Sequence, residues 1–266
     1  MEKLPSLWGG SFFLVCAREN AKGRVIAMID CLWPQGPRFK EHDGVFRLGT
    51  DAVMLAHFAG AGSSRDKTRA VDLGCGSGVI SIILAWQNPK LFVDGVELRP
   101  EAVGLAYENV NLCELSDRVR IIEGDIRLHR ELLTAGAYDL TVANPPYYAS
   151  GTGKLPADEG IAAARSEAFC TLGDVCQAAG YLTRWGGSFM LVHKPERLAD
   201  VFREMNAAGF EPKRLRLVQH KADSPPTLAL IEGRRGGKPS LTVEAPLILA
   251  NNDGSDSDEV KAVYRR

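Results

Sequence analysis

The sequence predicts an α/β fold: a doubly wound, mostly parallel sheet of seven strands with an antiparallel edge. Short apolar segments alternate with helical patterns, a glycine-rich turn follows the first segment, and a proline-rich turn ends the fourth. Helices are expected at residues 79–87 and at residues 171–185, the latter capped by Thr171. The last two strands form a closing pair at the antiparallel edge. The expected strands are residues 70–73, 92–97, 119–122, 138–143, 186–193, 213–218 and 227–233.

The glycine-rich turn, VDLGCGSG, joins the first strand to the helix over residues 79–87. Glycines allow a tight turn and the close approach of a ligand, and the N-terminus of the following helix offers free N–H groups. An acid that ends the second strand, Glu97, is placed to accept the hydroxyls of a ribose. The fingerprint of dinucleotide enzymes would have a third glycine at position 79, where this chain has valine. The turn therefore departs from the fingerprint of the enzymes that bind a dinucleotide pyrophosphate.

The tetrapeptide Asn144-Pro145-Pro146-Tyr147 ends the fourth strand. Proline fixes its own φ and keeps the preceding residue out of the helical region, so this turn should be extended and stiff. Such a turn can hold a planar NH2 group between the Asn144 side-chain oxygen and the Pro145 carbonyl, while the Tyr147 ring stacks on the substrate. A simple strand terminator is the alternative interpretation of the two prolines.

In this order, the two motifs resemble those of the class I S-adenosylmethionine (AdoMet) amino-methyltransferases. In that class the glycine loop follows the first strand, and an (Asn/Asp)-Pro-Pro-(Tyr/Phe) turn follows the fourth. The resemblance implies a Rossmann-like fold with a small N-terminal cap, AdoMet as cofactor, and methyl transfer without a metal. It also implies that Asp125 and Ile126, just past the third strand, hold the adenine ring of AdoMet.

A narrower resemblance spans residues 32–250. The segment FRLGTDAVMLAHFA at residues 46–59, together with residues 96–126, 191–198, 211–218 and 243–249, resembles the bacterial tRNA(Val) adenine-37 N6-methyltransferase family. This implies tRNA as partner and N6 methylation of the adenine next to the anticodon. It also implies that Thr50 and Asp51 pack beside the methionine end of AdoMet. The same segment reads as a helix capped at Thr50, and both interpretations are compatible.

These inferences give three groups of expected site residues. The catalytic group is Asn144, Pro145 and Tyr147. The cofactor group is Thr50, Asp51, Asp72, Gly74, Gly76, Gly78, Glu97, Asp125, Ile126 and Asn144. The substrate group is Pro146, Tyr147, Tyr148 and Arg165, the last from residues 149–168, which we interpret as a loop over the site.

Composition agrees with a cytoplasmic enzyme. The net charge of −1 gives no general attraction to RNA, but residues 184–238 carry eleven Lys or Arg against six Asp or Glu. If this surplus faced the proline-rich turn it would contact phosphates; a solvated strand edge is the alternative. Six cysteines and five histidines show no metal-binding spacing, so no metal is expected. The apolar run SFFLVCA is too short to span a membrane. The oligomeric state stays open.

The chain should divide into an extension at residues 1–31, a methyltransferase domain at 32–250 and a polar, disordered tail at 251–266. The extension lies outside the family resemblance, and we hypothesise that translation starts at Met28.

Three other functions fit the same residues. An amide presents the same NH2 group, so a glutamine on a release factor is one alternative substrate. Adenine in another RNA or in DNA is a second. A non-catalytic binding module that kept the AdoMet fold is a third, against which the intact Asn144 and Glu97 argue.

Overall fold

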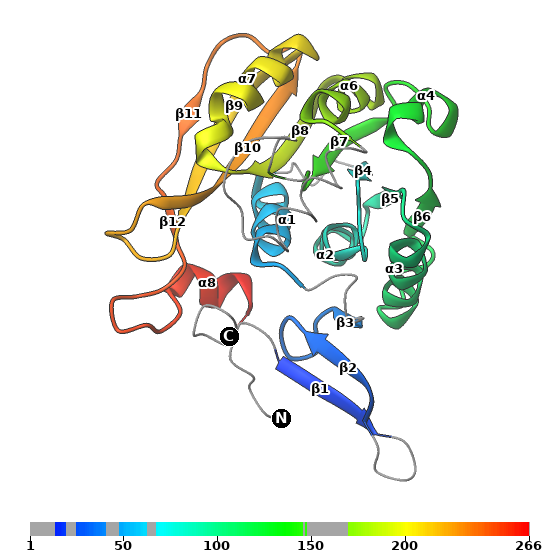
Figure 1. Ribbon diagram of the computed structural model, residues 1–266, viewed down its shortest axis with the longest axis vertical. Helices are drawn as coiled ribbons and strands as arrows, with labels where there is room; N and C mark the ends of the chain where they lie inside the picture. Colours follow the sequence, from blue (N-terminus) through cyan, green and yellow to red (C-terminus); the bar gives the residue numbers. More distant parts are fainter. Residues whose placement is uncertain are drawn as a thin grey trace, which may run out of the picture.

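A mostly parallel sheet forms the centre of the molecule (Figure 1). The computed structural model describes residues 14–19, 25–40, 48–62, 68–145, 147 and 170–265. Nine strands of that part pair in the order β11-β9-β10-β8-β7-β4-β5-β6, with β12 also on β9. Seven of them are long and two have only two residues each. They are β4 (Arg69–Leu73), β5 (Phe92–Glu97), β6 (Val119–Glu123), β7 (Tyr138–Ala143), β8 (Thr183–His193), β9 (Phe210–Gln219), β10 (Pro226–Arg235), β11 (Thr242–Val243) and β12 (Leu247–Ile248).

The expected sheet is confirmed, and the seven long strands correspond to the seven predicted ones. Neighbouring strands from β6 through β8 pair in parallel, whereas β10 pairs antiparallel with both β8 and β9. Among the seven long strands, the antiparallel strand β10 is therefore second from the edge, next to β9. The two short strands were not predicted; both pair in parallel with β9.

Helices cover both faces of this sheet, and each face has its own apolar core. Figure 1 shows α1, α2 and α3 on one side and α4, α6 and α7 on the other. The helices are α1 (Thr50–Gly62), α2 (Val79–Gln87), α3 (Pro100–Leu112), α4 (His129–Leu132), α6 (Leu172–Leu182), α7 (Leu198–Ala207) and α8 (Asp258–Val263), with short 3-10 turns η1 (Ile126–Leu128) and η2 (Pro195–Arg197).

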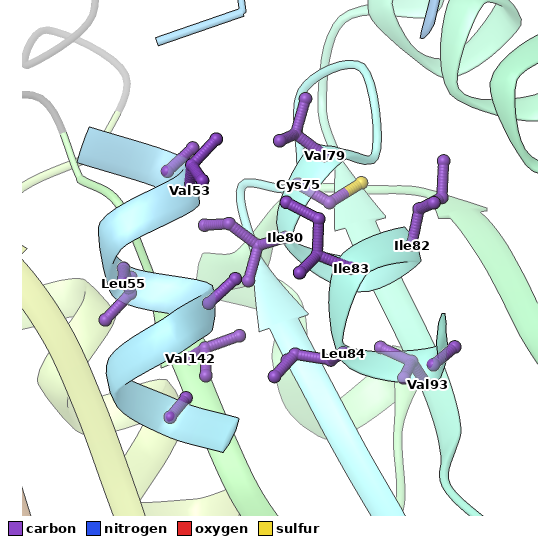
Figure 2. Close-up of a cluster of buried hydrophobic side chains, with 14 of the residues drawn as sticks. Val53, Leu55, Cys75, Val79, Ile80, Ile82, Ile83, Leu84, Val93 and Val142 are labelled. Atoms are coloured by element: carbon purple, nitrogen blue, oxygen red, sulfur yellow. The ribbon is translucent and has the colours of Figure 1, made fainter. Parts of the chain in front are cut away.

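Helix α2 is buried between the sheet and α1, which explains its continuous apolar sequence. All residues from Val79 to Ala85 are buried. Figure 2 shows Ile80 and Ile83 between the two helices, facing Val53 of α1. Because α1 is apolar on nearly all sides as well, it packs along its whole length and holds its first turn firmly at one edge of the sheet.

Helix α6 begins as predicted and ends three residues early. Thr171 is its N-cap, but the helix stops at Leu182 and β8 starts at Thr183. Thr183 is buried, pairs with Tyr138 of β7, and its Oγ1 lies 2.7 Å from Oγ1 of Thr141. A β-branched residue with a buried partner on the next strand favours the extended conformation, so tertiary pairing ends the helix.

A separate three-stranded antiparallel sheet precedes α1. It consists of β1 (Leu14–Glu19), β2 (Val25–Cys31) and β3 (Arg38–Lys40), in that order. It contacts α3 through Lys40, whose backbone N donates to Asn109 Oδ1 at 2.8 Å. This sheet matches the expected small cap, and because β2 pairs with β3, residues on both sides of position 31 belong to it.

The prediction of a disordered tail at residues 251–266 is wrong for residues 257–264. Ser257 caps α8 by accepting from Val260 N, and Val260, Val263 and Tyr264 are buried against the first core. Glu259 accepts two hydrogen bonds from the Arg216 guanidinium on β9. The segment is polar overall, but its few apolar residues pack against a core formed by residues distant in the sequence. Among the described residues, no helix is long and apolar enough to cross a bilayer.

Candidate functional site

The glycine-rich turn and the proline-rich turn leave neighbouring strands at the same edge of the sheet. Leu73, the last residue of β4, pairs with Ala143, the last residue of β7. From β4 the chain continues to β5 and β6 on one side, and β7 leads to β8 on the other. The strand order therefore reverses between β4 and β7, which is where open α/β sheets bind ligands.

The glycine-rich turn has the left-handed backbone that only glycine adopts without cost. Gly74, Gly76 and Gly78 all have positive φ, at 74°, 55° and 83°. The N–H groups of Gly74 and Cys75 both donate to the carbonyl oxygen of Val96, at 2.9 and 3.0 Å, which bends the turn under the end of β5. Gly78 is the N-cap of α2 and makes no side-chain cap hydrogen bond.

Glu97 ends β5 beside this turn with only 6% of its surface exposed. Its Oε2 accepts from Gly76 N at 2.9 Å, and its Oε1 accepts from Arg99 N and Nε at 3.0 and 3.2 Å. These bonds fix the carboxylate in one orientation. A carboxylate has about four acceptor positions, so capacity remains for a ligand hydroxyl.

Asp72 lies below the turn with no exposed surface. Its Oδ2 accepts from Ser81 N at 3.2 Å and Ser81 Oγ at 2.7 Å, while its Oδ1 is buried without a hydrogen-bond partner. Burial, opposed by the Ser81 hydrogen bonds, raises the pKa of Asp72 to about 7. A buried oxygen without a hydrogen-bond partner costs free energy.

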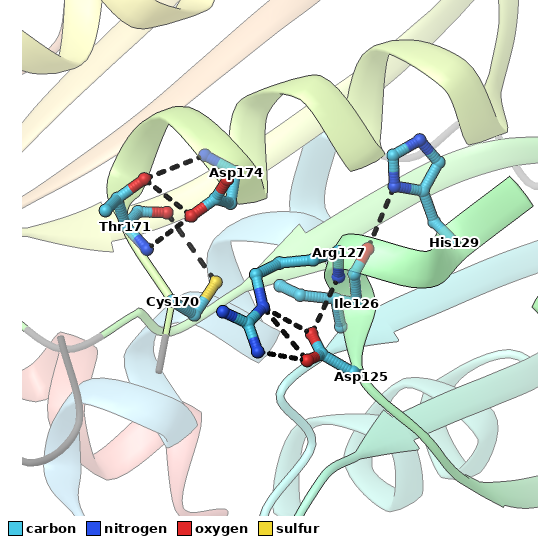
Figure 3. Close-up of polar contacts among 7 residues, drawn as sticks. All are labelled: Asp125, Ile126, Arg127, His129, Cys170, Thr171 and Asp174. Atoms are coloured by element: carbon cyan, nitrogen blue, oxygen red, sulfur yellow. Dashed lines mark hydrogen bonds and ion pairs between the residues drawn. The ribbon is translucent and has the colours of Figure 1, made fainter. Parts of the chain in front are cut away.

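Asp125 and Ile126 follow β6 at the same edge. Asp125 caps η1 by accepting from Arg127 N at 2.9 Å, and it forms an ion pair with the Arg127 guanidinium (Figure 3). The hydrogen bond from Arg127 lowers the pKa of Asp125. The carbonyl oxygen of Ile126 lies 2.9 Å from His129 Nδ1, which holds the short turn in place. The structure thus brings this pair to the expected edge, with Arg127 as an additional neighbour.

Tyr147 joins the proline-rich turn to the start of α1. Its hydroxyl oxygen lies 2.5 Å from Asp51 Oδ2 and 2.9 Å from Asn144 Oδ1. Asn144 is half-buried and Pro145 is buried. Thr50 begins α1, so the first turn of that helix, the β7 end and the tyrosine meet at one place. Pro146, Tyr148 and Arg165 lie outside the described residues.

His193, the last residue of β8, and Lys194, which follows it, also contact Tyr147. Neither was predicted as a site residue. The His193 ring lies 5.6 Å from the Tyr147 ring, edge to face, and Lys194 Nζ lies 5.2 Å from the Tyr147 ring centroid. His193 is buried, and its burial lowers its pKa to about 4. The one signal in the sequence is their position after an apolar strand, which gains meaning only once β8 is known to pair with β7.

Residues 233–238, one of the two basic segments, do not lie beside Asn144. Register aligns Arg234 of β10 with Ser188 and Leu140, near the amino ends of the parallel strands, so residues 233–238 lie at the far edge of the sheet. On β9, Arg214 pairs with Glu232 and Glu244, and Arg216 pairs with Glu259. These segments act mainly as charged strand surface. No group of three metal-binding side chains occurs in the part of the chain that the structure describes.

Comparison with known proteins agrees with this geometry. Residues 38–205 match the family model described as "Methyltransferase small domain". A protein of Tolumonas auensis is 30% identical over 82% of this chain and 87% of its own length, and one of Dickeya chrysanthemi is 31% identical over 85% and 90%. Both are named tRNA1(Val) (adenine(37)-N6)-methyltransferase. The chain belongs to the tRNA1(Val) (adenine(37)-N6)-methyltransferase family.

Solved structures support the fold of this methyltransferase. A predicted O-methyltransferase from Agrobacterium tumefaciens matches with a TM-score of 0.67 at 20% identity, covering 81% of this chain and 96% of that one. A precorrin-6y C5,15-methyltransferase from Geobacter metallireducens matches with a TM-score of 0.52 at 14% identity, covering 74% and 94%. At this identity they bear on architecture alone.

Proposed function

We propose that the protein transfers a methyl group from AdoMet to N6 of adenine 37 in tRNA1(Val). Its family supports this activity, and the observation that carries it at the level of residues is the pairing of Leu73 with Ala143. That pairing puts the glycine-rich turn and Asn144 on adjacent strand ends. A donor held by one turn and an amine held by the other are then neighbours. We expect the enzyme to act in the cytoplasm, where its tRNA is made.

The residues around the glycine-rich turn fit AdoMet. The unpaired Asp72 Oδ1 and the left-handed glycines offer a polar group and a close backbone approach to a nucleoside with an amino acid part. Glu97 would accept the ribose hydroxyls, and Asp125 with Ile126 would hold the adenine ring. Thr50 and Asp51 would lie at the methionine end. AdoMet supplies a methyl group made reactive by a positively charged sulfur, so the protein needs no metal.

The task left to the protein is to present the substrate amine. The lone pair of an adenine amine is delocalised into the ring, which makes the nitrogen a weak nucleophile. Asn144 Oδ1 and the Pro145 carbonyl would accept its two hydrogens and stabilise the positive charge that develops on nitrogen during transfer. Positioning the reacting atoms in line can supply roughly 7–11 kcal/mol. No prior deprotonation is required, since the methylated amine is acidic.

The Tyr147 ring would stack on the flipped adenine, and Pro146, Tyr148 and Arg165 would contact the nucleotide. Stacking on an aromatic ring contributes about 1–3 kcal/mol per base. Lys194 lies over this ring, so a base on the opposite face would leave the tyrosine between a cation and the substrate. The target base must leave its neighbours to reach such a site.

The substrate is tested by competition among the alternatives. Purified protein and labelled AdoMet are incubated with unmodified tRNA1(Val), the same tRNA with guanine at position 37, ribosomal RNA, DNA and a release factor. We expect label only in the first, recovered as N6-methyladenosine after digestion. Label in the release factor or in DNA would show that the site acts on another substrate. If no candidate substrate acquires label, the protein is a non-catalytic binding module.

Asn144→Ala tests the amine contact. We expect kcat to fall by about 10²-fold or more, because an acceptor that acts in the transition state is lost. The AdoMet dissociation constant, measured by calorimetry, should change little. Asn251→Ala, on the exposed surface, serves as the control. A loss of AdoMet binding equal to the loss of kcat would contradict the role given to Asn144.

A further inference from the structure

Tyr147 has one hydroxyl hydrogen and two nearby acceptors. Asp51 Oδ2 lies 2.5 Å from the hydroxyl oxygen, and Asn144 Oδ1 lies 2.9 Å from it. A phenol donates only one hydrogen bond, so the two oxygens compete for it. Whichever oxygen wins, the other is left facing the hydroxyl without a donated hydrogen.

The tyrosine ring is fixed, so the hydroxyl stays between these acceptors. His193 lies edge to face with the ring, with centroids 5.6 Å apart, and Lys194 Nζ lies 5.2 Å from the ring centroid. Asp51 is held too, because its Oδ1 accepts from Ala52 N at 2.8 Å within the first turn of α1. Two elements thus contact the hydroxyl group, and a third contacts the ring.

The competition favours the carboxylate. A charged acceptor forms a shorter and stronger hydrogen bond than a neutral amide oxygen, and the Asp51 contact is the shorter one. With its hydrogen directed to Asp51, the tyrosine leaves Asn144 Oδ1 without a hydrogen-bond donor among the residues that the structure describes. That is the state in which the amide oxygen accepts most strongly from a substrate amine.

We propose that Asp51 is a positioning residue for methyl transfer: it draws the Tyr147 hydroxyl hydrogen away from Asn144 Oδ1 and so keeps that oxygen available for the substrate amine. The inference rests on the proposed methyl transfer and adds a role for the first turn of α1. Without Asp51, the hydroxyl donates to Asn144 Oδ1. An oxygen that already accepts one hydrogen bond holds the developing ammonium less well.

A double-mutant cycle tests this role under single-turnover conditions with tRNA1(Val). Asp51→Ala is made in the wild-type protein and in Tyr147→Phe, which keeps the ring and removes the hydroxyl. We expect Asp51→Ala to slow methyl transfer about tenfold in the wild-type background, the loss of one typical hydrogen bond. In the Tyr147→Phe background the same change should have no further effect, because there is no hydroxyl hydrogen left to redirect.

Controls separate this role from binding and folding. Asp51→Asn keeps the acceptor for Ala52 N but loses the charge, so it should fall between wild type and Asp51→Ala. AdoMet affinity and the thermal unfolding temperature are measured for every variant. If Asp51→Ala costs the same factor in both backgrounds, or weakens AdoMet binding in proportion to the rate, the positioning role is overturned. A wild-type protein that methylates no RNA overturns both this role and the proposed function.

Discussion

His193 shows how burial sets the charge of a single residue in this site. Its pKa is lowered to about 4, first by loss of water around the ring and then by the nearby Arg197. Its Nδ1 accepts from Lys194 N at 2.9 Å, so in the neutral ring Nε2 carries the hydrogen. Protonation would turn that acceptor into a donor and break the contact, which ties the conformation next to Tyr147 to a neutral imidazole.

This gives a pH dependence with a definite sign. Between pH 6.5 and pH 4 the unfolded chain binds a proton at His193 that the folded protein does not, so the free energy of unfolding falls as pH falls. Well above pH 6.5, His193 is neutral in both the folded and the unfolded chain, so its titration no longer lowers the free energy of unfolding. Relative to His193→Gln, the wild type should lose about 2 kcal/mol more stability between pH 6.5 and pH 5. Urea unfolding at both pH values measures it, and equal losses in the two proteins would contradict the prediction.

At the scale of single residues, the sequence was sufficient to identify those whose residue type specifies a turn. Glycines before a helix and an asparagine before two prolines have a local meaning, and the structure places both where the patterns indicate. His193 and Lys194 have no such local meaning in the sequence. Their role comes from the pairing of β7 with β8, which no local pattern specifies. The assigned roles of the site residues stay predictions for the experiments above.

Among the elements, the start of α6 is the clearest example of local control. Thr171 Oγ1 accepts from Asp174 N at 3.2 Å, and Asp174 Oδ2 accepts from Thr171 N at 2.9 Å (Figure 3). Each side chain satisfies a backbone N–H of the other. Helix α6 packs against η1, whose N-cap is Asp125. The cap therefore also supports the expected adenine site.

Thr171→Ala should lower the free energy of unfolding by about 1 kcal/mol, since the capping hydroxyl is lost. Thr171→Ser keeps the hydroxyl and should lose much less. The urea midpoint reports the change if the slope of the transition stays constant. Equal destabilisation by alanine and serine would mean that the methyl group of Thr171, and not its hydroxyl, is what matters.

Helix starts were predictable because caps are local, whereas helix ends depended on distant partners. The sequence pattern continued α6 through Trp185, yet the buried contact of Thr183 with Thr141 ends it at Leu182. The short strands β11 and β12 were missed for the same reason. Two-residue strands have no periodicity of their own and exist because β9 offers an edge.

At the scale of the whole molecule, the largest difference between prediction and structure is found at residues 257–264. A polar, acidic segment was expected to stay disordered, but Val260, Val263 and Tyr264 are buried in the core on the α1 side of the sheet. Composition averages over a segment, while burial depends on which few side chains reach the core. Three well-placed apolar residues and one serine cap are enough to order α8.

Deleting residues 257–266 should therefore destabilise the domain by several kcal/mol, at roughly 1.5–3 kcal/mol for each fully buried large side chain. Glu259→Gln, which only weakens the contact with Arg216, should cost about 1 kcal/mol or less. Thermal unfolding of the two variants compares them. An unchanged midpoint after the deletion would show that the buried contacts of α8 contribute nothing to folding.

The pairing of Leu73 with Ala143 also limits how the family can change. A β-ladder shifts only by whole residues, about 3.3 Å at a time, and an odd shift turns every side chain to the opposite face. The offset between the two strand ends, which precede the glycine-rich turn and Asn144, therefore changes only in steps of whole residues. If the methyl group passes between these two turns as proposed, the loops around them can vary in sequence while this offset stays the same.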